Sequence, residues 1–160
     1  MAGLKLYRPN VGIVIFNKDK KVWIGKRSDI NTTDSWQMPQ GGIDKDEDPM
    51  QAAIREDYEE TGIRSIKNIF VLNKWIKYDL PSEISKNKWN GKFKGQIQKW
   101  YLFYFYGTDT EINLNLSKKP EFLKWRWSDI EYIENNVTKF KKDSYKEVFQ
   151  NFNKEIKNYY

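Results

Sequence analysis

The sequence predicts a single α+β domain. Its 160 residues are enough for one hydrophobic core and too few for two full domains. Hydrophobic residues make up 39% and aromatic residues 16%, a composition typical of a folded protein rather than a disordered one. Segments with the periodicity of strands and segments with the periodicity of helices both occur along the chain. No internal repeat, low-complexity segment or linker interrupts them, so we expect one domain.

Five segments carry the apolar runs or the alternation typical of β-strands. They are residues 11–16, 21–26, 66–78, 98–107 and 122–127. The first two flank the turn-forming sequence NKDK and predict a hairpin, and the fourth, QKWYLFYFYG, is expected to be buried on both faces. Residues 31–42 are rich in turn formers and predict a loop or short strands, while the polar residues 81–95 predict an ordered excursion.

Three helices are expected. The first has Asp48 as its N-cap, Pro49 at its first position and Gly62 as its stop. Ser128 and Glu131 have the spacing of a capping box and predict a short second helix. The last helix shows one apolar stripe at helical spacing, formed by Tyr145, Val148, Phe149, Phe152 and Ile156.

The chain contains neither cysteine nor histidine. This composition excludes disulfides, thiol nucleophiles, Ser-His-Asp and Cys-His catalysis and histidine-ligated zinc. Chemistry must therefore use carboxylates, lysines, tyrosines, hydroxyls and oxygen-liganded cations. We find no apolar stretch of membrane-spanning length and no signal-peptide core, so we expect a cytoplasmic protein without a membrane partner. The net charge of +6 fits an anionic partner such as a nucleic acid, or an ordinary lysine-rich surface.

Negative charge is concentrated in one run, REDYEETG at residues 55–62. On an ideal helix, Glu56, Glu59 and Glu60 form one acidic stripe, and Arg55 reaches Glu59 at i,i+4. The face expected to be buried carries Met50, Ala53, Ile54, Tyr58 and Thr61. The like-charged pair Glu56/Glu60 costs about 0.2–0.5 kcal/mol unless a cation lies there. By itself the stripe fits either a solvated acidic face or a site for a hard cation such as Mg²⁺.

Residues upstream of this run complete a longer pattern. The spacing G-x5-E-x7-R-E-U-x-E-E-x-G-U, where U is apolar, is formed by Gly41, Glu47, Arg55, Glu56, Glu59, Glu60, Gly62 and Ile63. It resembles the signature of the Nudix hydrolases. The resemblance implies a Nudix domain over residues 6–153, with a mixed sheet between helices, that hydrolyses a nucleoside diphosphate linked to another group. Asp57 departs from the pattern at an apolar position; it is either an extra metal ligand or a polar group buried at a cost in free energy.

The resemblance also implies the roles of the site residues. The implied catalytic residues are Glu47, Arg55, Glu56, Glu59, Glu60 and Glu121, and the implied metal ligands are Glu56, Glu59, Glu60, Glu121 and the Gly41 carbonyl. The cofactor would be two or more Mg²⁺ ions, for which Mn²⁺ substitutes. Two roles stay open: Glu59 binds either a metal or Arg55, and Glu121 is either a ligand or base, or a charge at a strand edge. The general base is expected to be one of the glutamates, because histidine is absent.

Segments outside the signature resemble a narrower class. WQMPQGG (36–42) and WNGKFKGQIQKWYL (89–102) are similar to the bacterial RNA pyrophosphohydrolases, which remove pyrophosphate from triphosphorylated 5′ ends and so initiate mRNA decay. Asymmetrical diadenosine tetraphosphate hydrolases share WQMPQGG and the GQxQKW element. The substrate-binding residues suggested are Arg8, Arg27, Gln40, Tyr78, Gln98, Lys99, Val137, Phe140 and Lys141.

Three functions therefore stay open at this stage. They are 5′-RNA pyrophosphohydrolysis, dinucleoside polyphosphate hydrolysis and non-catalytic binding of nucleic acid. Tyr78 and Phe140 would either stack on bases or pack in the core. The sequence suggests no protein partner.

Overall fold

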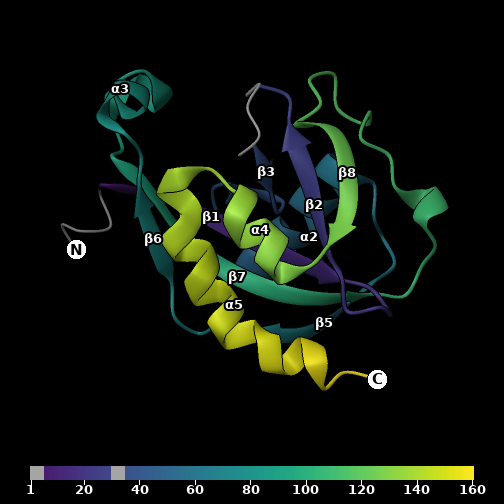
Figure 1. Cartoon of the computed structure of the whole chain (residues 1–160). Helices are drawn as coiled ribbons and strands as arrows, with labels where there is room; N and C mark the ends of the chain where they lie inside the picture. Colours follow the sequence, from purple (N-terminus) through teal and green to yellow (C-terminus); the bar gives the residue numbers. More distant parts are fainter. Residues whose placement is uncertain (1–5, 30–34) are drawn as a thin grey trace.

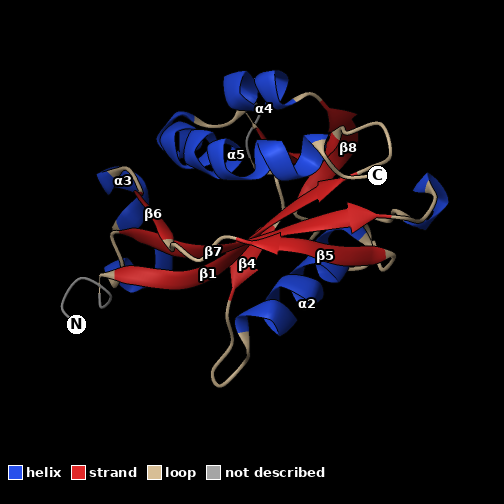
Figure 2. Cartoon of the chain, turned by 90° about the horizontal axis from the view of Figure 1, so that it is seen from below, coloured by secondary structure: helices blue, strands red, loops and turns tan. Residues whose placement is uncertain are grey.

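The computed structural model describes residues 6–29 and 35–160 and shows a mixed β-sheet with helices on both faces (Figure 1). In the turned view, α2 (Pro49–Thr61) covers one face, while α4 (Ile130–Asn136) and α5 (Lys142–Lys157) cover the other (Figure 2). The predicted α+β class and the predicted sheet between helices are confirmed.

The strands of the described residues form one sheet with the central order β3-β2-β1-β7-β5. They are β1 (Tyr7–Phe16), β2 (Val22–Arg27), β3 (Trp36–Gln37), β4 (Gln40–Gly42), β5 (Ile66–Val71), β6 (Ile76–Asp79), β7 (Gly95–Phe105) and β8 (Phe122–Ser128). The two longest strands, β1 and β7, run parallel, whereas the other described pairs are antiparallel. Central strands with both faces covered need near-continuous apolar sequence, which explains the run VGIVIF.

Pairing at one end of β1 and β7 assembles the site. β4 pairs with β1 and places Gly41 opposite Val11. β6 pairs with β7 and places Tyr78 opposite Gln96. Because β1 and β7 are neighbours, the start of the signature and the β6–β7 pair lie at the same end of the sheet.

Each face of the sheet has its own hydrophobic core. The cluster on the α2 side includes Val11, Ile13, Trp23, Ala52, Ala53 and Phe103. The cluster on the other side includes Val14, Trp100, Tyr145, Val148, Phe149, Phe152 and Ile156, so the predicted apolar stripe of the last helix is confirmed. Burying one such large side chain contributes about 1.5–3 kcal/mol. The Tyr145 hydroxyl also accepts a hydrogen bond from the Met38 amide at 2.8 Å, which ties α5 to the WQMPQGG segment.

Helix α2 has the boundaries that its sequence predicts. The Asp48 carboxylate accepts hydrogen bonds from the amides of Met50 and Gln51, and Pro49 occupies the first turn. Gly62 ends the helix with a φ of 77°, a left-handed conformation that favours glycine.

The buried face of α2 is rotated relative to the predicted one. Ile54 was expected in the core but is 41% exposed, while Glu60, expected in the acidic stripe, is buried. The buried positions are Ala52, Ala53, Asp57, Glu60 and Thr61. Two adjacent alanines let the helix backbone approach the sheet closely. The arc that carries them faces the sheet, while Met50 packs only partly buried against this core and Ile54 lies outside it.

The prediction of a capping box at Ser128 is wrong. Ser128 is the last residue of β8, paired opposite Val22, and its hydroxyl donates to the Asp129 carbonyl at 3.3 Å. Helix α4 starts after Asp129, which is its N-cap residue. The helix thus begins one residue later than predicted, so Ser128 lies one position before the N-cap.

The excursion between β6 and β7 contains α3 (Ser82–Ser85) and the 3₁₀ turn η1 (Lys88–Gly91). Two further 3₁₀ turns are η2 (Asp109–Glu111) and η3 (Lys139–Lys141). Residues 31–34 of the predicted turn segment lie outside the described residues. Within the described ranges, we find no helix with the length and apolar character of a membrane span.

Asp57 lies in the buried face of α2 without a full set of partners. Its side chain is 0% exposed, and the Thr61 hydroxyl donates to its Oδ1 at 2.9 Å. Its Oδ2 has no hydrogen-bond partner in the described part of the chain. Burial raises the pKa of Asp57 well above its usual range, and the charge of Glu111 adds to the shift. Full burial and the Thr61 contact favour a buried polar group over an extra metal ligand.

We predict that Asp57→Asn stabilises the protein by about 1–3 kcal/mol at pH 7. The folded pKa lies above the unfolded one, so the stability that this carboxyl contributes is full below the unfolded pKa and is lost as the pH rises. Asparagine does not ionise, and the advantage of the variant therefore shrinks toward about pH 4. Urea denaturation at both pH values measures this, with Asp19→Asn in an exposed turn as the control. Equal stability of wild type and Asp57→Asn at pH 7 would contradict the account.

Candidate active site

Arg55 connects the signature loop with the signature helix. Its guanidinium donates to both Glu47 carboxylate oxygens at 2.8 and 2.9 Å and to the Gly42 carbonyl at 2.9 Å. It also donates to Glu56 at 2.9 Å and to Glu59 at 3.3 Å. The Arg55 hydrogen bonds lower the pKa of Glu47 to about 2, and Glu47 in turn raises the pKa of Arg55. A planar cation with five donors in fixed positions can hold more oxygens at once than a lysine, which has three donors.

Glu56 and Glu60, one helical turn apart, lie mostly buried beside Gly41. A Cβ on Gly41 would overlap the Glu56 carboxyl group, so any other residue at this position would displace the Glu56 side chain. The two carboxyl groups lie next to each other, and burial raises the pKa of both. The negative charges of Glu121 and Glu56 raise the pKa of Glu60 further. Two buried carboxylates at this separation repel each other unless a proton or a cation lies between them.

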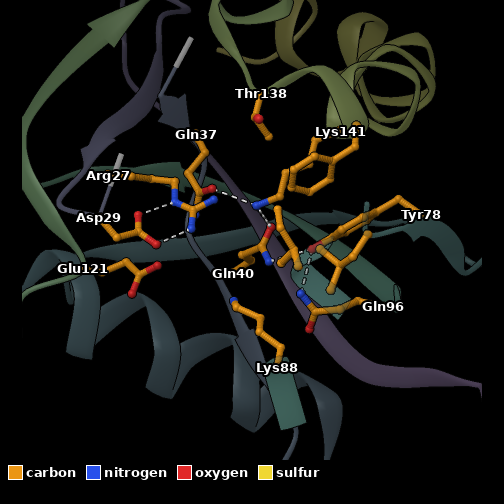
Figure 3. Close-up of a pocket in the computed structure, with 13 residues that line it drawn as sticks. Arg27, Asp29, Gln37, Gln40, Tyr78, Lys88, Gln96, Glu121, Thr138 and Lys141 are labelled. Carbon is orange, nitrogen blue, oxygen red and sulfur yellow. Dashed lines mark hydrogen bonds and ion pairs between the residues drawn. The ribbon is translucent and has the colours of Figure 1, made fainter. Parts of the chain in front are cut away.

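A pocket of about 320 Å³ lies close to Glu60, whose charge acts on Lys141 in the pocket lining. Figure 3 shows the residues that line the pocket, Glu121 and Lys141 among them. Gln40, which lines the pocket, precedes Gly41 on β4 and so joins the pocket to the carboxylate pair. The predicted site residues in the lining are Arg27, Gln40, Tyr78, Glu121, Phe140 and Lys141. The structure thus brings together predicted side chains from five separate segments of the chain.

Lys141 is a buried cation in this pocket. Its side chain is 4% exposed, and its ammonium group donates to the side-chain oxygens of Gln37 at 2.8 Å and Gln40 at 3.2 Å. Burial, together with the positive charges of Arg27 and Lys88, lowers the pKa of Lys141 to about 7. Two neutral amide oxygens only partly replace water, so an incoming anion would meet a poorly solvated positive charge.

Two aromatic rings form one side of the pocket. The ring centroids of Tyr78 and Phe140 are 5.9 Å apart, with an interplanar angle of 35°. The Tyr78 hydroxyl accepts hydrogen bonds from Gln96 at 2.6 Å and from Gln40 at 3.2 Å, which fixes the position of its ring. The Tyr78 side chain is buried, whereas Phe140 is partly exposed. The two rings therefore present an aromatic surface to the pocket, and hydrogen bonds fix the position of the Tyr78 ring.

Arg27 and Glu121 lie on the opposite side of the pocket, as Figure 3 shows. The Arg27 guanidinium pairs with both oxygens of Asp29, at 3.0 and 2.6 Å. The Glu121 carbonyl accepts the Ser28 amide at 3.0 Å, which holds the start of β8 beside β2. A carboxylate is thus brought near Glu60 from a distant part of the chain.

Two predicted substrate residues on β7 lie outside the pocket lining. Gln98 is buried, and its amide donates to the Asn10 side-chain oxygen at 2.8 Å. The Lys99 ammonium lies over the Trp75 ring at 5.9 Å from its centroid. Both side chains therefore make intramolecular contacts away from the pocket.

Val137 and Arg8 are the other predicted residues that do not line the pocket. Val137 is fully buried in the core on the α5 side. Arg8 lies at the edge of the site, where its guanidinium donates to the Gln96 side-chain oxygen at 3.1 Å. Gln96 contacts Tyr78 directly, so Arg8 is one residue removed from the pocket.

The pocket also contains residues that the sequence did not single out. They are Asp29, Gln37, Leu80, Ile84, Lys88, Gln96 and Thr138. Gln37 and Gln96 belong to the motifs WQMPQGG and GQIQKW, and the register of β7 against β6 explains why Gln96 reaches the pocket. Lys88 comes from the excursion, where no periodic pattern marks a site.

Comparisons with known proteins agree with this site. The model of the protein family described as NUDIX domain matches residues 6–152 of this chain. A protein named RNA pyrophosphohydrolase from Wolbachia sp. subsp. Brugia malayi (strain TRS) is 46% identical over 151 residues, which cover 94% of this chain and 92% of that protein. A protein of the same name from Bartonella tribocorum is 45% identical over 155 residues, which cover 91% of this chain and 90% of that protein. The chain belongs to the Nudix family.

Solved Nudix structures share the fold at lower sequence identity. The E. coli dihydroneopterin triphosphate pyrophosphohydrolase has a TM-score of 0.69 at 20% identity, over 92% of this chain and 99% of that one. The C. elegans Ap4A hydrolase, in a binary complex, has a TM-score of 0.62 at 20% identity, over 91% of this chain and 98% of that one. At this identity the likeness concerns the fold alone.

As a Nudix hydrolase, the protein is an enzyme that cleaves phosphoanhydride bonds, and its family works with divalent metal ions. Among the described residues, no three acidic side chains are grouped tightly enough in this conformation to hold a metal ion. Two features nevertheless fit one: Glu60 Oε1 is buried without a hydrogen-bond partner, and Glu56 lies against it. Oxygen ligands of this kind suit a hard divalent cation. Glu56 and Glu60 would hold the ion, with Glu59 and Glu121 nearby.

We predict opposite effects of Glu60→Gln with and without metal. Without metal, the variant should have a higher melting temperature than wild type, because it removes a buried carboxyl beside Glu56. Mg²⁺ should stabilise wild type by about 2.7 kcal/mol at a hundredfold excess over its Kd, and this gain should be lost in the variant. Thermal melts with and without Mg²⁺ test both effects, with Glu131→Gln on α4 as the control. The same Mg²⁺ gain in variant and wild type would remove Glu60 from the metal site.

Proposed function

We propose that the protein is a Mg²⁺-dependent RNA 5′-pyrophosphohydrolase, which removes pyrophosphate from triphosphorylated 5′ ends and so starts mRNA decay. The observation that carries this proposal is the pocket, which places an aromatic pair and a buried cation next to buried carboxylates. A terminal nucleotide of RNA offers a base for the rings and phosphates for the cations. The names of the relatives from Wolbachia and Bartonella support the same activity. The enzyme would act in the cytoplasm, where such RNA is made.

Binding would use the two sides of the pocket. A base would stack against Tyr78 and Phe140, which needs no sequence-specific contact because every base has a π-face. Arg27 would exchange its pairing with Asp29 for a phosphate, whose geometry matches the guanidinium fork. Lys141, with its low pKa, would regain full charge beside an anion.

Hydrolysis would take place at the carboxylate pair. Two or more Mg²⁺ ions, for which Mn²⁺ substitutes, would neutralise phosphate charge and lower the pKa of a water molecule. Glu56 and Glu60 would hold the ions, while Arg55 keeps Glu56 and Glu59 in place. The base that accepts the proton of this water would be a carboxylate of the same group, with Glu59 and Glu121 as the candidates.

Asymmetrical hydrolysis of dinucleoside polyphosphates is the second candidate. The same carboxylates would cut the same kind of anhydride, and one ring pair accepts the base of either substrate. Non-catalytic binding of nucleic acid does not explain why Glu56 and Glu60 are kept buried together, since this costs free energy that binding alone does not require.

We predict that Glu56→Gln lowers kcat by about a hundredfold or more while the fold is kept. The amide removes a charged metal ligand but has the same shape and still accepts from Arg55. Mg²⁺-dependent turnover and far-UV circular dichroism are measured together, with Glu131→Gln as the control. A folded Glu56→Gln with activity within about threefold of wild type would sink the assignment of Glu56.

We predict that triphosphorylated RNA with an unpaired 5′ end is hydrolysed with a higher kcat/KM than diadenosine tetraphosphate. Phe140→Ala should lower kcat/KM for this RNA by about tenfold, since stacking one base contributes roughly 1–3 kcal/mol. Phe70→Ala, on β5 and 37% exposed, is the control. Both substrates are compared at one salt concentration. If diadenosine tetraphosphate wins by tenfold and Phe140→Ala leaves RNA turnover unchanged, the dinucleotide function replaces the RNA function.

A further inference from the structure

The excursion of residues 81–94, here called the basic flap, combines positive charge with aromatic rings next to the pocket. It carries four lysines and one glutamate, together with Trp89 and Phe93. Figure 1 shows α3 of the flap projecting beyond the end of the sheet. Both ends of the flap are held: the Leu80 amide donates to the Lys94 carbonyl at 2.8 Å, and the Lys94 amide donates to the Leu6 carbonyl at 2.9 Å. The flap is therefore a fixed extension of the β6–β7 pair.

Trp89 has an unusual backbone conformation at the centre of the flap. Trp89 and Asn90 have φ values of 49° and 56°, in the left-handed region that residues with a Cβ rarely adopt. Each such residue costs about 1–2 kcal/mol. The Trp89 ring packs edge-on against Phe93, with centroids 6.0 Å apart and an interplanar angle of 78°. Strain of this kind persists where a particular side-chain position is needed.

Two cations lie close to the Trp89 ring. The Arg8 guanidinium carbon is 5.0 Å from the ring centroid, and the Lys88 ammonium nitrogen is 5.2 Å from it. Trp89 itself remains partly exposed. A ring with two cations beside it matches a nucleotide, whose base stacks while its phosphate is neutralised.

The same two cations join Trp89 to the pocket. Lys88 lines the pocket, and in Figure 3 its side chain points toward Gln40. Arg8 donates to Gln96, which donates to the Tyr78 hydroxyl. An RNA strand whose first base stacks on the Tyr78–Phe140 pair and which continues toward Trp89 would meet Arg8 and Lys88 next.

We propose that the basic flap is a second RNA-binding site, with Trp89 as a stacking surface and Lys88 and Arg8 as phosphate contacts for nucleotides downstream of the 5′ end. The ligand is single-stranded RNA, which offers unpaired bases and a regular negative charge; an acidic peptide offers the charge without the bases. This inference rests on the proposed function, because the 5′ end is assumed to occupy the pocket. It adds that the enzyme senses RNA length beyond the nucleotides being processed.

Binding of 5′-monophosphorylated RNA tests this proposal without any turnover. Fluorescence anisotropy compares unstructured oligonucleotides of two and of eight nucleotides on wild type, Trp89→Ala, Trp89→Phe and Trp75→Ala. Trp75 is the matched control, a partly exposed tryptophan with a lysine over its ring in the β5–β6 connection. We expect Trp89→Ala to weaken binding of the longer RNA about tenfold and of the shorter RNA less than twofold. Trp89→Phe should retain most of the affinity, and Trp75→Ala should have no effect.

A second readout isolates the phosphate contact. Lys88→Ala should lower the slope of log affinity against log salt concentration for the longer RNA by about 0.7. The proposal is overturned if Trp89→Ala binds the longer RNA with an affinity within twofold of wild type. It is overturned too if the substitution lowers the affinity for the longer and the shorter RNA by the same factor. A third outcome would also overturn it: an octaglutamate peptide binds wild type as tightly as the longer RNA does, and Trp89→Ala lowers the affinity for both ligands by the same factor. The surface would then recognise acidic proteins. Pyrophosphate release from triphosphorylated RNA is measured separately, so its absence would refute the proposed function and leave the binding result standing.

Discussion

Arg55 is the contact on which the active end of the protein depends. It holds the signature loop through Glu47 and Gly42 and the signature helix through Glu56 and Glu59. If the loop and the helix moved apart, at least one carboxylate would lose its partner in a partly buried site, at a cost in free energy. This one side chain therefore converts two flexible features, a loop and a row of long acidic side chains, into a fixed arrangement.

The arginine neutralises only part of the charge that the helix gathers. Glu47, Glu56 and Glu59 have Arg55 as their partner, whereas no ion pair of the described residues includes Glu60, which lies buried beside Glu56. Burial raises the pKa of Glu60 well above its usual range, because its negative charge lacks a counterion there. A net positive protein thus concentrates negative charge at one point because the chemistry needs cations there. Stability is reduced for function, as is common at active sites.

Much of this arrangement could be predicted from local sequence. The cap at Asp48, the stop at Gly62 and the pairing of Arg55 with Glu59 depend on neighbours within one or two turns, and all three are confirmed. The orientation of α2 could not be predicted, because it depends on how closely Ala52 and Ala53 let the helix approach the sheet.

Contacts between distant segments were equally hidden. Gln98 and Lys99 were singled out from a motif, but pairing with β6 brings Gln96 of the same motif to the pocket. Lys88 and Trp89 come from a segment without periodicity, so that only the folded chain shows their place beside Arg8.

We infer that the pair Glu56/Glu60, held in place by Arg55, binds the divalent metal of this enzyme. A crystal structure of the protein with Mn²⁺, using anomalous scattering to locate the ion, tests it most directly. The account predicts Mn²⁺ bonded to the carboxylates of both Glu56 and Glu60, with the Arg55 contacts kept; Mn²⁺ bound elsewhere, with this pair unchanged, would contradict it.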